Sequence, residues 1–380
     1  MDISVFFQAN QALDESAIEK AYVHQQSQDK PEAALGKLDE AVFRLANLQG
    51  IATPAVEKPY VAVFAGDHGV AEQGVSAQVR WASSSKLTRL ANKQGAIDLL
   101  ALQQVFSVDL FNCGIFQENT DCDRSTFSSV CTPIAAGTQD FTVQPAMTEQ
   151  QILRSMLIGF AAAERAYSQN ADIFIAGELG VGNTASASAI GAFLSGQPVA
   201  DWVGDGSGIG FAQRKTKVAF IEQALRYHQA ELTSPLKALQ ILGGFEIAAL
   251  CGAYIRCAQL GLPILVDGFV CSIAVWVADL ISRNDQLVNC QSEDAFWKLG
   301  KCSLPETMFC TCGSCPRLVD WCFFSHQSSE PGHERLLEIL AVEPLLNLEM
   351  SLGEGSAAIL ALPLLRSACA LHVNFAKSDG

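Results

Sequence analysis

The sequence predicts an α/β protein built on a doubly wound, mostly parallel β-sheet. Five short apolar runs each end in a glycine or polar cluster, at 60–69, 108–114, 172–180, 263–269 and 321–328. These runs lack apolar–polar alternation, which is typical of strands buried on both faces of a parallel sheet. Longer amphipathic segments, such as 148–168 and 211–230, separate the runs and predict helices. Because strand and helix alternate, we expect a doubly wound sheet, in which ligands bind beyond the carboxyl ends of the strands.

Both chain ends are predicted to be helical. "DESAIEK" offers Asp14 or Ser16 as the cap of a helix, and "PGHERLLEILA" places Pro331 near the beginning of another. We expect the two ends to pack together as a small helical subdomain. The predicted division of the chain is this subdomain from residues 1–50 and 330–380, an α/β domain from 51–329, and within it an irregular, cysteine-rich insertion near 284–320.

The composition predicts a substantial buried core and argues against partners that need positive charge. Hydrophobic residues make up 49% of the 380 residues, charged residues make up 17%, and the formal net charge is −15. Nucleic acids and anionic membranes are bound by clustered Lys and Arg, so we expect neither as a partner. The longest apolar region, 237–281, is interrupted by Glu246, Arg256 and Asp267 and falls short of the ~20 apolar residues of a membrane helix. The N-terminus shows no signal-peptide pattern, so we expect a soluble, cytoplasmic protein.

The 13 cysteines predict reduced thiols and not a disulfide scaffold, because they are scattered through a large chain without a signal peptide. Six of them crowd one segment: Cys290, Cys302, Cys310, Cys312, Cys315 and Cys322. "CTCGSC" (310–315) with Cys322 is also a candidate structural zinc site, although a zinc ribbon needs two C-x2-C pairs. We take reduced loop cysteines as the default and expect neither a metal nor a cofactor.

Two glycine-rich loops are candidates for phosphate binding. "GELGVGNTASASA" (177–189) follows a predicted strand and opens into a helical run, so Gly180 and Gly182 let the backbone approach a ligand while free N–H groups and hydroxyls form a cradle. The alternative is a tight strand–helix turn with ordinary caps. "VGDGSGIG" (203–210) is a second such loop, with Lys217 at the start of a following helix, and the two loops together would clamp one phosphate. The alternative here is a surface turn with a solvated Lys217.

Polar residues also follow two other predicted strands. "GDHGV" (66–70) places Asp67 and His68 at a strand end, where we interpret Asp67 as a loop-organising residue because no second ligand lies at metal-binding spacing. His326 and His333 in "SHQSSEPGH" are interpreted as capping and hydrogen-bonding residues rather than as metal ligands.

Glu354 lies between Gly353 and Gly355, where an apolar helix is predicted to begin. A carboxylate at this point would be partly desolvated, and the two glycines leave open backbone on both sides. From the residues alone, Glu354 is either an acid in the first turn of the helix or a base that acts on a substrate.

Eight segments together resemble the nicotinate-nucleotide–dimethylbenzimidazole phosphoribosyltransferase family, which makes the lower-ligand riboside of cobalamin. They occur in the expected order: "KPEAALGKLDE" (30–40), "FAGDHGVAEQGVSA" (64–77), "GTQDF" and "PAMT" (within 137–148), "GELGVGNTASASA" (177–189), "GGFEIAAL" (243–250), "GLPILVDGF" (261–269), "SHQSSEPGH" (325–333) and "EPLLNLEMSLGEGSAAILALPLL" (343–365).

The resemblance implies a Rossmann-like domain, a small helical domain from both chain ends, and a homodimer with sites near its interface. It implies that Glu354 is the catalytic base, which takes the proton from one ring nitrogen of a benzimidazole as the other attacks C1′ of nicotinate mononucleotide. Glu178 resembles the second active-site acid, which stabilises developing positive charge or contacts the base. The pyridinium of the nucleotide is already a good leaving group, so no metal or redox cofactor is required. A non-catalytic nucleotide-binding regulator of the same fold is the alternative.

The resemblance also implies which residues hold the substrates. The nucleotide phosphate would be held by Gly180, Gly182, Asn183, Thr184, Gly204, Gly206, Ser207 and Lys217, and the azole base would be held by Ser76, Arg80 and Leu352. The chain departs from the family beside the base, because the ungapped run after "GVSA" is "QVRWASSS" and Arg80 replaces the expected glutamine. The preferred base is therefore open between dimethylbenzimidazole and a more polar azole.

Overall fold

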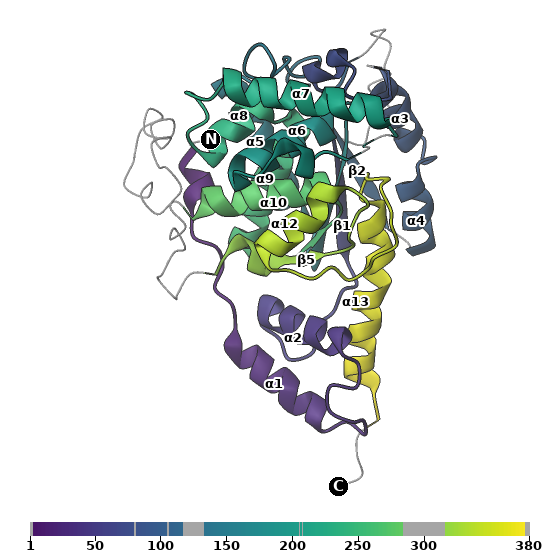
Figure 1. Cartoon of the computed structure of the whole chain (residues 1–380). Coiled ribbons are helices and arrows are strands. Elements are labelled where there is room, and N and C mark those ends of the chain that lie inside the picture. Colours follow the sequence, from purple (N-terminus) through teal and green to yellow (C-terminus); the bar gives the residue numbers. More distant parts are fainter. Residues whose placement is uncertain are drawn as a thin grey trace.

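Five parallel strands form the centre of the computed structural model (Figure 1). They are β1 (Pro59–Gly66), β2 (Val108–Gly114), β3 (Ile173–Leu179), β4 (Ile264–Val266) and β5 (Cys322–Phe324), and they lie in the order β2-β1-β3-β4-β5. Every neighbouring pair is parallel. Each strand matches one of the five apolar runs, with β1 beginning one residue earlier than its run, and most strand residues are buried because helices cover both faces of the sheet. The predicted doubly wound α/β fold is confirmed.

The structure describes residues 3–79, 81–104, 106–116, 133–204, 206, 208–283 and 316–376. Arg80, Ser207 and most of the predicted insertion at 284–320, with all five of its cysteines, lie outside these ranges.

Most helices within the described ranges lie between successive strands of the chain, as the amphipathic segments predict, while two precede β1 and two follow β5. They are α1 (Glu15–Gln26), α2 (Lys37–Gln49), α3 (Ala82–Ala91), α4 (Ala96–Gln104), α5 (Glu149–Ser168), α6 (Asn183–Ser195), α7 (Phe211–Tyr227), α8 (Pro235–Leu242), α9 (Phe245–Leu260), α10 (Phe269–Ser282), α12 (Pro331–Leu340) and α13 (Ser356–Asn374). Asp14 is the cap of α1, where its carboxylate accepts the Ala17 N–H at 3.2 Å, and Pro331 is the first residue of α12.

Helices cover the sheet on two faces. On one face α9 lies across β1, β2 and β3 and packs closely against α5, and α10 lies beside it on β3. Gly159 of α5 and Gly252 of α9 permit this close crossing, because a Cβ on either residue would overlap the backbone of the opposite helix. On the other face α13 packs against β3, β4 and α4.

The C-terminal half of α13 extends beyond the sheet to α1 and α2, which lie together at the bottom of the view in Figure 1. α2 packs against both α1 and α13, and the Gln28 side-chain amide donates a 2.6 Å hydrogen bond to the carbonyl of His372. α12, in contrast, packs against α6 and α10 on the α/β body. The boundaries of the helical subdomain remain a prediction. Because α12 packs on the α/β body, we place residues 331–340 with the larger domain.

α13 is long and apolar enough to cross a membrane by length and composition alone. More than half of this stretch is buried inside the protein, against α2, α4 and the sheet. That packing is typical of a core helix.

Candidate active site

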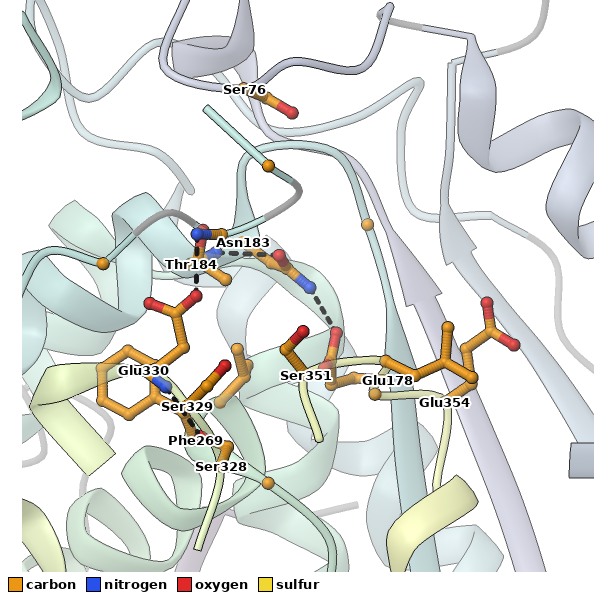
Figure 2. A pocket seen from close by; sticks show the side chains of 18 of the residues that line it. Ser76, Glu178, Asn183, Thr184, Phe269, Ser328, Ser329, Glu330, Ser351 and Glu354 are labelled. Carbon is orange, nitrogen blue, oxygen red and sulfur yellow. Dashed lines mark hydrogen bonds between the residues drawn. The ribbon is translucent and has the colours of Figure 1, made fainter. Parts of the chain in front are cut away.

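A cavity of about 840 Å³ opens at the carboxyl end of β3. The chain runs from β1 to β2 on one side of β1 and then returns to β3 on the other side, so the strand order reverses between β1 and β3. Doubly wound sheets bind ligands at such a reversal, because the loops diverge there. The cavity wall combines the end of β3, the start of α6, the residues Gly204, Gly206 and Gly208, and the segments 326–331 and 350–354 (Figure 2).

Gly180, Gly182, Asn183 and Thr184 lie in the wall where β3 leads into α6. α6 begins at Asn183, directly after Gly182, whose φ of +95° favours glycine. The start of a helix presents free N–H groups and a positive dipole end to an anion. Gly180 has a packing role as well, because a Cβ there would overlap the carbonyl oxygen of Gly66. The argument for phosphate binding therefore depends on the start of α6 more than on the number of glycines.

The second glycine loop lies directly beside the first, since a Cβ on Gly206 would be 2.9 Å from Thr184 Oγ1. Gly204 and Gly206 line the wall, and the Gly206 N–H donates a 2.7 Å hydrogen bond to Glu330 Oε1. Lys217 lies in the second turn of α7 and is fully buried, with Nζ donating a 2.9 Å hydrogen bond to Thr184 Oγ1. The alternative of a solvated Lys217 is wrong. The lysine lies behind the wall and reaches the cavity through the Thr184 hydroxyl.

Glu354 does not belong to a helix. α13 begins at Ser356, and Gly353, Glu354 and Gly355 precede it with φ angles of +71°, +63° and +83°. A left-handed conformation costs a residue with a side chain roughly 1 kcal/mol or more, and such residues cluster at functional sites. The alternative of an acid in the first helical turn is wrong, and Glu354 is instead held in a strained loop at the cavity wall.

The loop of residues 353–355 contacts β3 directly, and this contact brings Glu354 close to Glu178. The Glu354 N–H donates a 3.2 Å hydrogen bond to the backbone carbonyl of Glu178. A Cβ on Gly177 would overlap backbone atoms of Glu354 and Gly355, and a Cβ on Gly353 would lie 3.1 Å from Glu178 Oε1. Glycines at 177 and 353 are thus required for the close approach. In Figure 2 the two carboxylates point in different directions, that of Glu178 toward Asn183 and that of Glu354 away from it.

The environment of Glu354 makes its carboxylate a stronger proton acceptor. The residue is only 9% exposed, and this burial raises its pKa. The positive charges of Lys86 and then Arg89 oppose the shift, and of these two residues only Lys86 lines the cavity. The balance leaves the pKa above its ordinary value, as a general base near neutral pH requires.

The pKa of Glu178 is raised more strongly than that of Glu354. Burial raises its pKa to about 8, and the negative charges of Glu246, Asp267 and Glu354 add to the shift. Its carboxyl group also accepts a hydrogen bond from the Asn183 amide, which joins it to the start of α6 (Figure 2). With a pKa near 8, Glu178 is mostly protonated at pH 7.

Asp267 holds the loop of Glu354 in place from the end of β4. Its Oδ2 accepts the Gly355 N–H at 3.0 Å and its Oδ1 accepts the Ala358 N–H at 3.0 Å. The Asp267 carboxylate therefore caps α13 from a position 88 residues earlier in the chain. Since Asp267 is buried and charged groups make the stronger hydrogen bonds, this contact is a main determinant of where Glu354 lies.

Four further residues that line the same cavity bear on the azole site expected from the resemblance. Ser76 and Leu352, expected to hold the base, both line the cavity, and Leu352 is 55% exposed. Gln78 and Lys86 line it as well. Arg80, the third residue expected to hold the base, lies outside the described ranges.

Asp67 organises three strand ends, as interpreted from the sequence. One carboxylate oxygen accepts the Val181 N–H at 2.8 Å after β3, and the other accepts the Phe116 N–H at 2.8 Å after β2. His68 is fully buried beside it, with Nε2 2.6 Å from Glu246 Oε1. Both side chains lie behind the turn into α6, where Asp67 holds the Val181 N–H and a Cβ on Gly182 would lie 3.1 Å from the Cβ of His68.

Of the two histidines singled out in the sequence at 325–333, one is structural and the other lines the cavity. His333 bonds to Ser272 at 3.0 Å and to Ser328, and burial lowers its pKa to about 3, which confirms a hydrogen-bonding role. His326 lines the cavity. Free, buried thiols occur within the described ranges at Cys113, Cys251, Cys257, Cys271, Cys322 and Cys369. In the same ranges no three His, Cys, Asp or Glu side chains gather as a metal site would require.

Four charged residues of the site were not predicted. Asp267 and Glu330 position loops, while Lys86 and Arg214 line the cavity. Asp267 follows an apolar run as Asp67 does, so its place after a strand was a usable signal. Lys86 and Arg214 lie in helical segments where a charged residue is ordinary, and only the packing of α3 and α7 shows that they face the cavity.

Comparison with known proteins agrees with this geometry. A family model described as a phosphoribosyltransferase matches residues 10–291 and 306–380. A nicotinate-nucleotide–dimethylbenzimidazole phosphoribosyltransferase from Pseudomonas putida is 39% identical over 96% of this chain and 93% of its own length. The chain belongs to this phosphoribosyltransferase family.

Other members give the same result. A nicotinate-nucleotide–dimethylbenzimidazole phosphoribosyltransferase from Azotobacter vinelandii is 40% identical, again over 96% of this chain and 93% of its own length. The crystal structure of CobT from Thermus thermophilus is similar with a TM-score of 0.81 and 31% identity, covering 96% of this chain and 100% of that chain. The Rossmann-like fold and the family resemblance predicted from the sequence are therefore confirmed.

Proposed function

We propose that this protein transfers the phosphoribosyl group of nicotinate mononucleotide to 5,6-dimethylbenzimidazole or a related azole. The products are the α-riboside 5′-phosphate and nicotinate, and the pathway is assembly of the cobalamin lower ligand. Membership of the phosphoribosyltransferase family supports the activity. The observation that carries it in this chain is Glu354, a buried carboxylate with a raised pKa in the wall of a cavity that also contains the start of a helix.

The proposed reaction is a displacement at C1′ of the nucleotide. One azole nitrogen attacks C1′, the bond from C1′ to the pyridinium nitrogen breaks, and its electron pair returns to the nicotinate ring. The azole becomes cationic as the new bond forms, and the proton on its second nitrogen passes to Glu354. Attack opposite the leaving group inverts C1′, so a β-nucleotide gives an α-riboside.

Glu178 acts in this proposal as a neutral group. Because its pKa is about 8, it offers little negative charge to an oxocarbenium-like transition state at pH 7. A protonated carboxyl group is a hydrogen-bond donor. Of the two roles that the resemblance implies for Glu178, we therefore propose contact with the azole base.

The nucleotide phosphate is proposed to lie at the start of α6, between the two glycine loops. Backbone N–H groups and the helix dipole attract an anion there without a lysine in direct contact. Arg214, in the first turn of α7, also lines the cavity and supplies local positive charge in a chain whose net charge is −15. Lys217 supports this end by holding the Thr184 hydroxyl.

We also propose a cytoplasmic homodimer with its sites near the interface, as the family resemblance implies. Light scattering on the purified protein measures the mass directly. A particle of monomer mass at micromolar concentration would contradict the dimer and leave the catalytic proposal unaffected.

The substitution Glu354→Gln tests the function. We expect kcat for riboside phosphate formation to fall about 100- to 10,000-fold, the usual contribution of a general base, while nicotinate mononucleotide still binds. Product mass and calorimetric binding are the two measurements. Glu349→Gln is the matched control, because Glu349 carries the same group five residues earlier but is exposed and outside the cavity wall. A nucleotide-binding regulator would form no product in either the parent protein or the variant.

A further inference from the structure

Lys86 is a charged residue of the cavity wall to which the proposed reaction gives no role. It lies in the first half of α3, is partly buried, and lines the same wall as Glu178 and Glu354. Its ammonium group forms no hydrogen bond or ion pair with any residue in the described ranges. An ammonium that loses its water without gaining a partner is costly. Lys86 thus needs a partner when a substrate displaces the water.

We expect Lys86 to lie beside the incoming azole base and not beside the departing nicotinate. Among charged groups its positive charge has the largest effect on Glu354, and it also acts on Glu178. Glu354 must reach the N–H of the attacking azole, so an azole in place extends from Glu354 along this wall. Displacement with inversion puts nicotinate on the opposite side of C1′, away from the group that serves the attacker.

Other residues that line the same cavity as Lys86 are also polar. Gln78 lines the same wall and its side-chain amide has no partner in the described part of the chain. Ser76 stands across the cavity from Ser351 and the two glutamates in Figure 2. Two ring methyl groups would bury the Lys86 ammonium against hydrocarbon and would offer no acceptor to it or to the Gln78 amide. A ring oxygen or ring nitrogen at the same place would accept a hydrogen bond from the ammonium.

We propose that the preferred base is an azole with a hydrogen-bond acceptor on the ring edge remote from its reacting nitrogens, as in a hydroxybenzimidazole, and that Lys86 binds this acceptor. The inference rests on the proposed phosphoribosyl transfer and adds the class of base. Lys86 is then a specificity-determining residue. A buried hydrogen bond from a charged donor discriminates strongly, because an analogue without the acceptor leaves the charge unpaired.

The experiment compares three bases at saturating nicotinate mononucleotide: 5-hydroxybenzimidazole, 5,6-dimethylbenzimidazole and adenine. In the parent protein we expect kcat/KM for the hydroxylated base to exceed that for the dimethyl base about tenfold or more, the effect of one hydrogen bond to a charged group. In Lys86→Met the ratio is expected to fall to about one or below, because an apolar side chain of similar length now meets the methyl groups. Adenine as the best substrate, with the same dependence on Lys86, would identify a ring nitrogen as the acceptor.

Arg89→Met is the matched control. Arg89 lies on the same helix and its charge also acts on Glu354, but it is exposed and outside the cavity wall, so the ratio should not change. Lys86→Gln repeats the test with a polar side chain. A parent protein that prefers the dimethyl base, or a ratio unchanged in both Lys86 variants, would overturn the inference. So would an equal rise in KM for the nucleotide with every base, since Lys86 would then bind the nicotinate carboxylate. Absence of product with all three bases would refute the phosphoribosyl transfer itself.

Discussion

The contact between Gly177 and the loop of Glu354 predicts that Gly177→Ala folds but loses most of its activity. A Cβ on residue 177 would lie less than 2.5 Å from three backbone atoms of Glu354 and Gly355. Non-bonded carbon atoms keep about 3.5 Å apart, so the loop must move away from β3 by about 1 Å. A displacement of about 1 Å at a catalytic group costs on the order of 100-fold in rate. Overpacking by one methyl group costs about 1–3 kcal/mol of stability, which a chain of this size tolerates.

The assay measures three quantities on the purified variant. We expect kcat to fall on the order of 100-fold, nicotinate mononucleotide to bind with nearly the parent affinity, and the thermal unfolding transition to remain cooperative. Gly210→Ala is the control, because residue 210 has φ −81° and a Cβ there meets no atom within 4 Å. If folded Gly177→Ala keeps the parent kcat, the position of this loop does not limit the reaction, and the role given to Glu354 is wrong.

Two further predictions concern the carboxyl groups around Glu354. Because the pKa of Glu178 rises from 4.5 to about 8 on folding, the unfolded chain loses a proton that the folded protein keeps, so this group destabilises the fold as pH rises between those values. Glu178→Gln should therefore gain stability relative to the parent between pH 5 and pH 9, by up to about 5 kcal/mol in urea unfolding, and a constant difference would refute the shift. Asp267→Asn replaces one of two acceptors for the N–H groups of Gly355 and Ala358 by a donor, so we expect about 2–4 kcal/mol less stability and a lower kcat with nucleotide affinity retained. A parallel loss of kcat and nucleotide binding in Asp267→Asn would show a general collapse of the site and contradict a specific role in positioning Glu354.

The part of the site where we propose that the phosphate binds was predictable from local patterns. The turn from β3 into α6 follows from an apolar run, a glycine with positive φ and a run of small helical residues, all contiguous in the chain. Lys217 was predicted to belong to this part of the site, but its burial was not, because whether a lysine is solvated depends on what packs over it. Lys217 became a support for Thr184 only through the packing of α7 against α6.

The part of the site around Glu354 was less predictable from the sequence. The unusual setting of Glu354 between two glycines was visible in the sequence, but its left-handed conformation and its contact with β3 were not. Its anchor, Asp267, comes from another strand end. Lys86 shows no pattern that separates it from an ordinary charged residue on a helix surface.

The sequence by itself determined the sheet, the helices between its strands and the family, because apolar runs, caps and glycine turns act over a few residues and can be recognised without knowing what lies nearby. Only the tertiary structure decided the chemistry of the site. Burial gathered Glu178, Glu246, Asp267 and Glu354 near one strand end, and their mutual repulsion and lost hydration raise the pKa of Glu178 to about 8. Such shifts depend on distances and on excluded water, and neither is a property of any short stretch of chain.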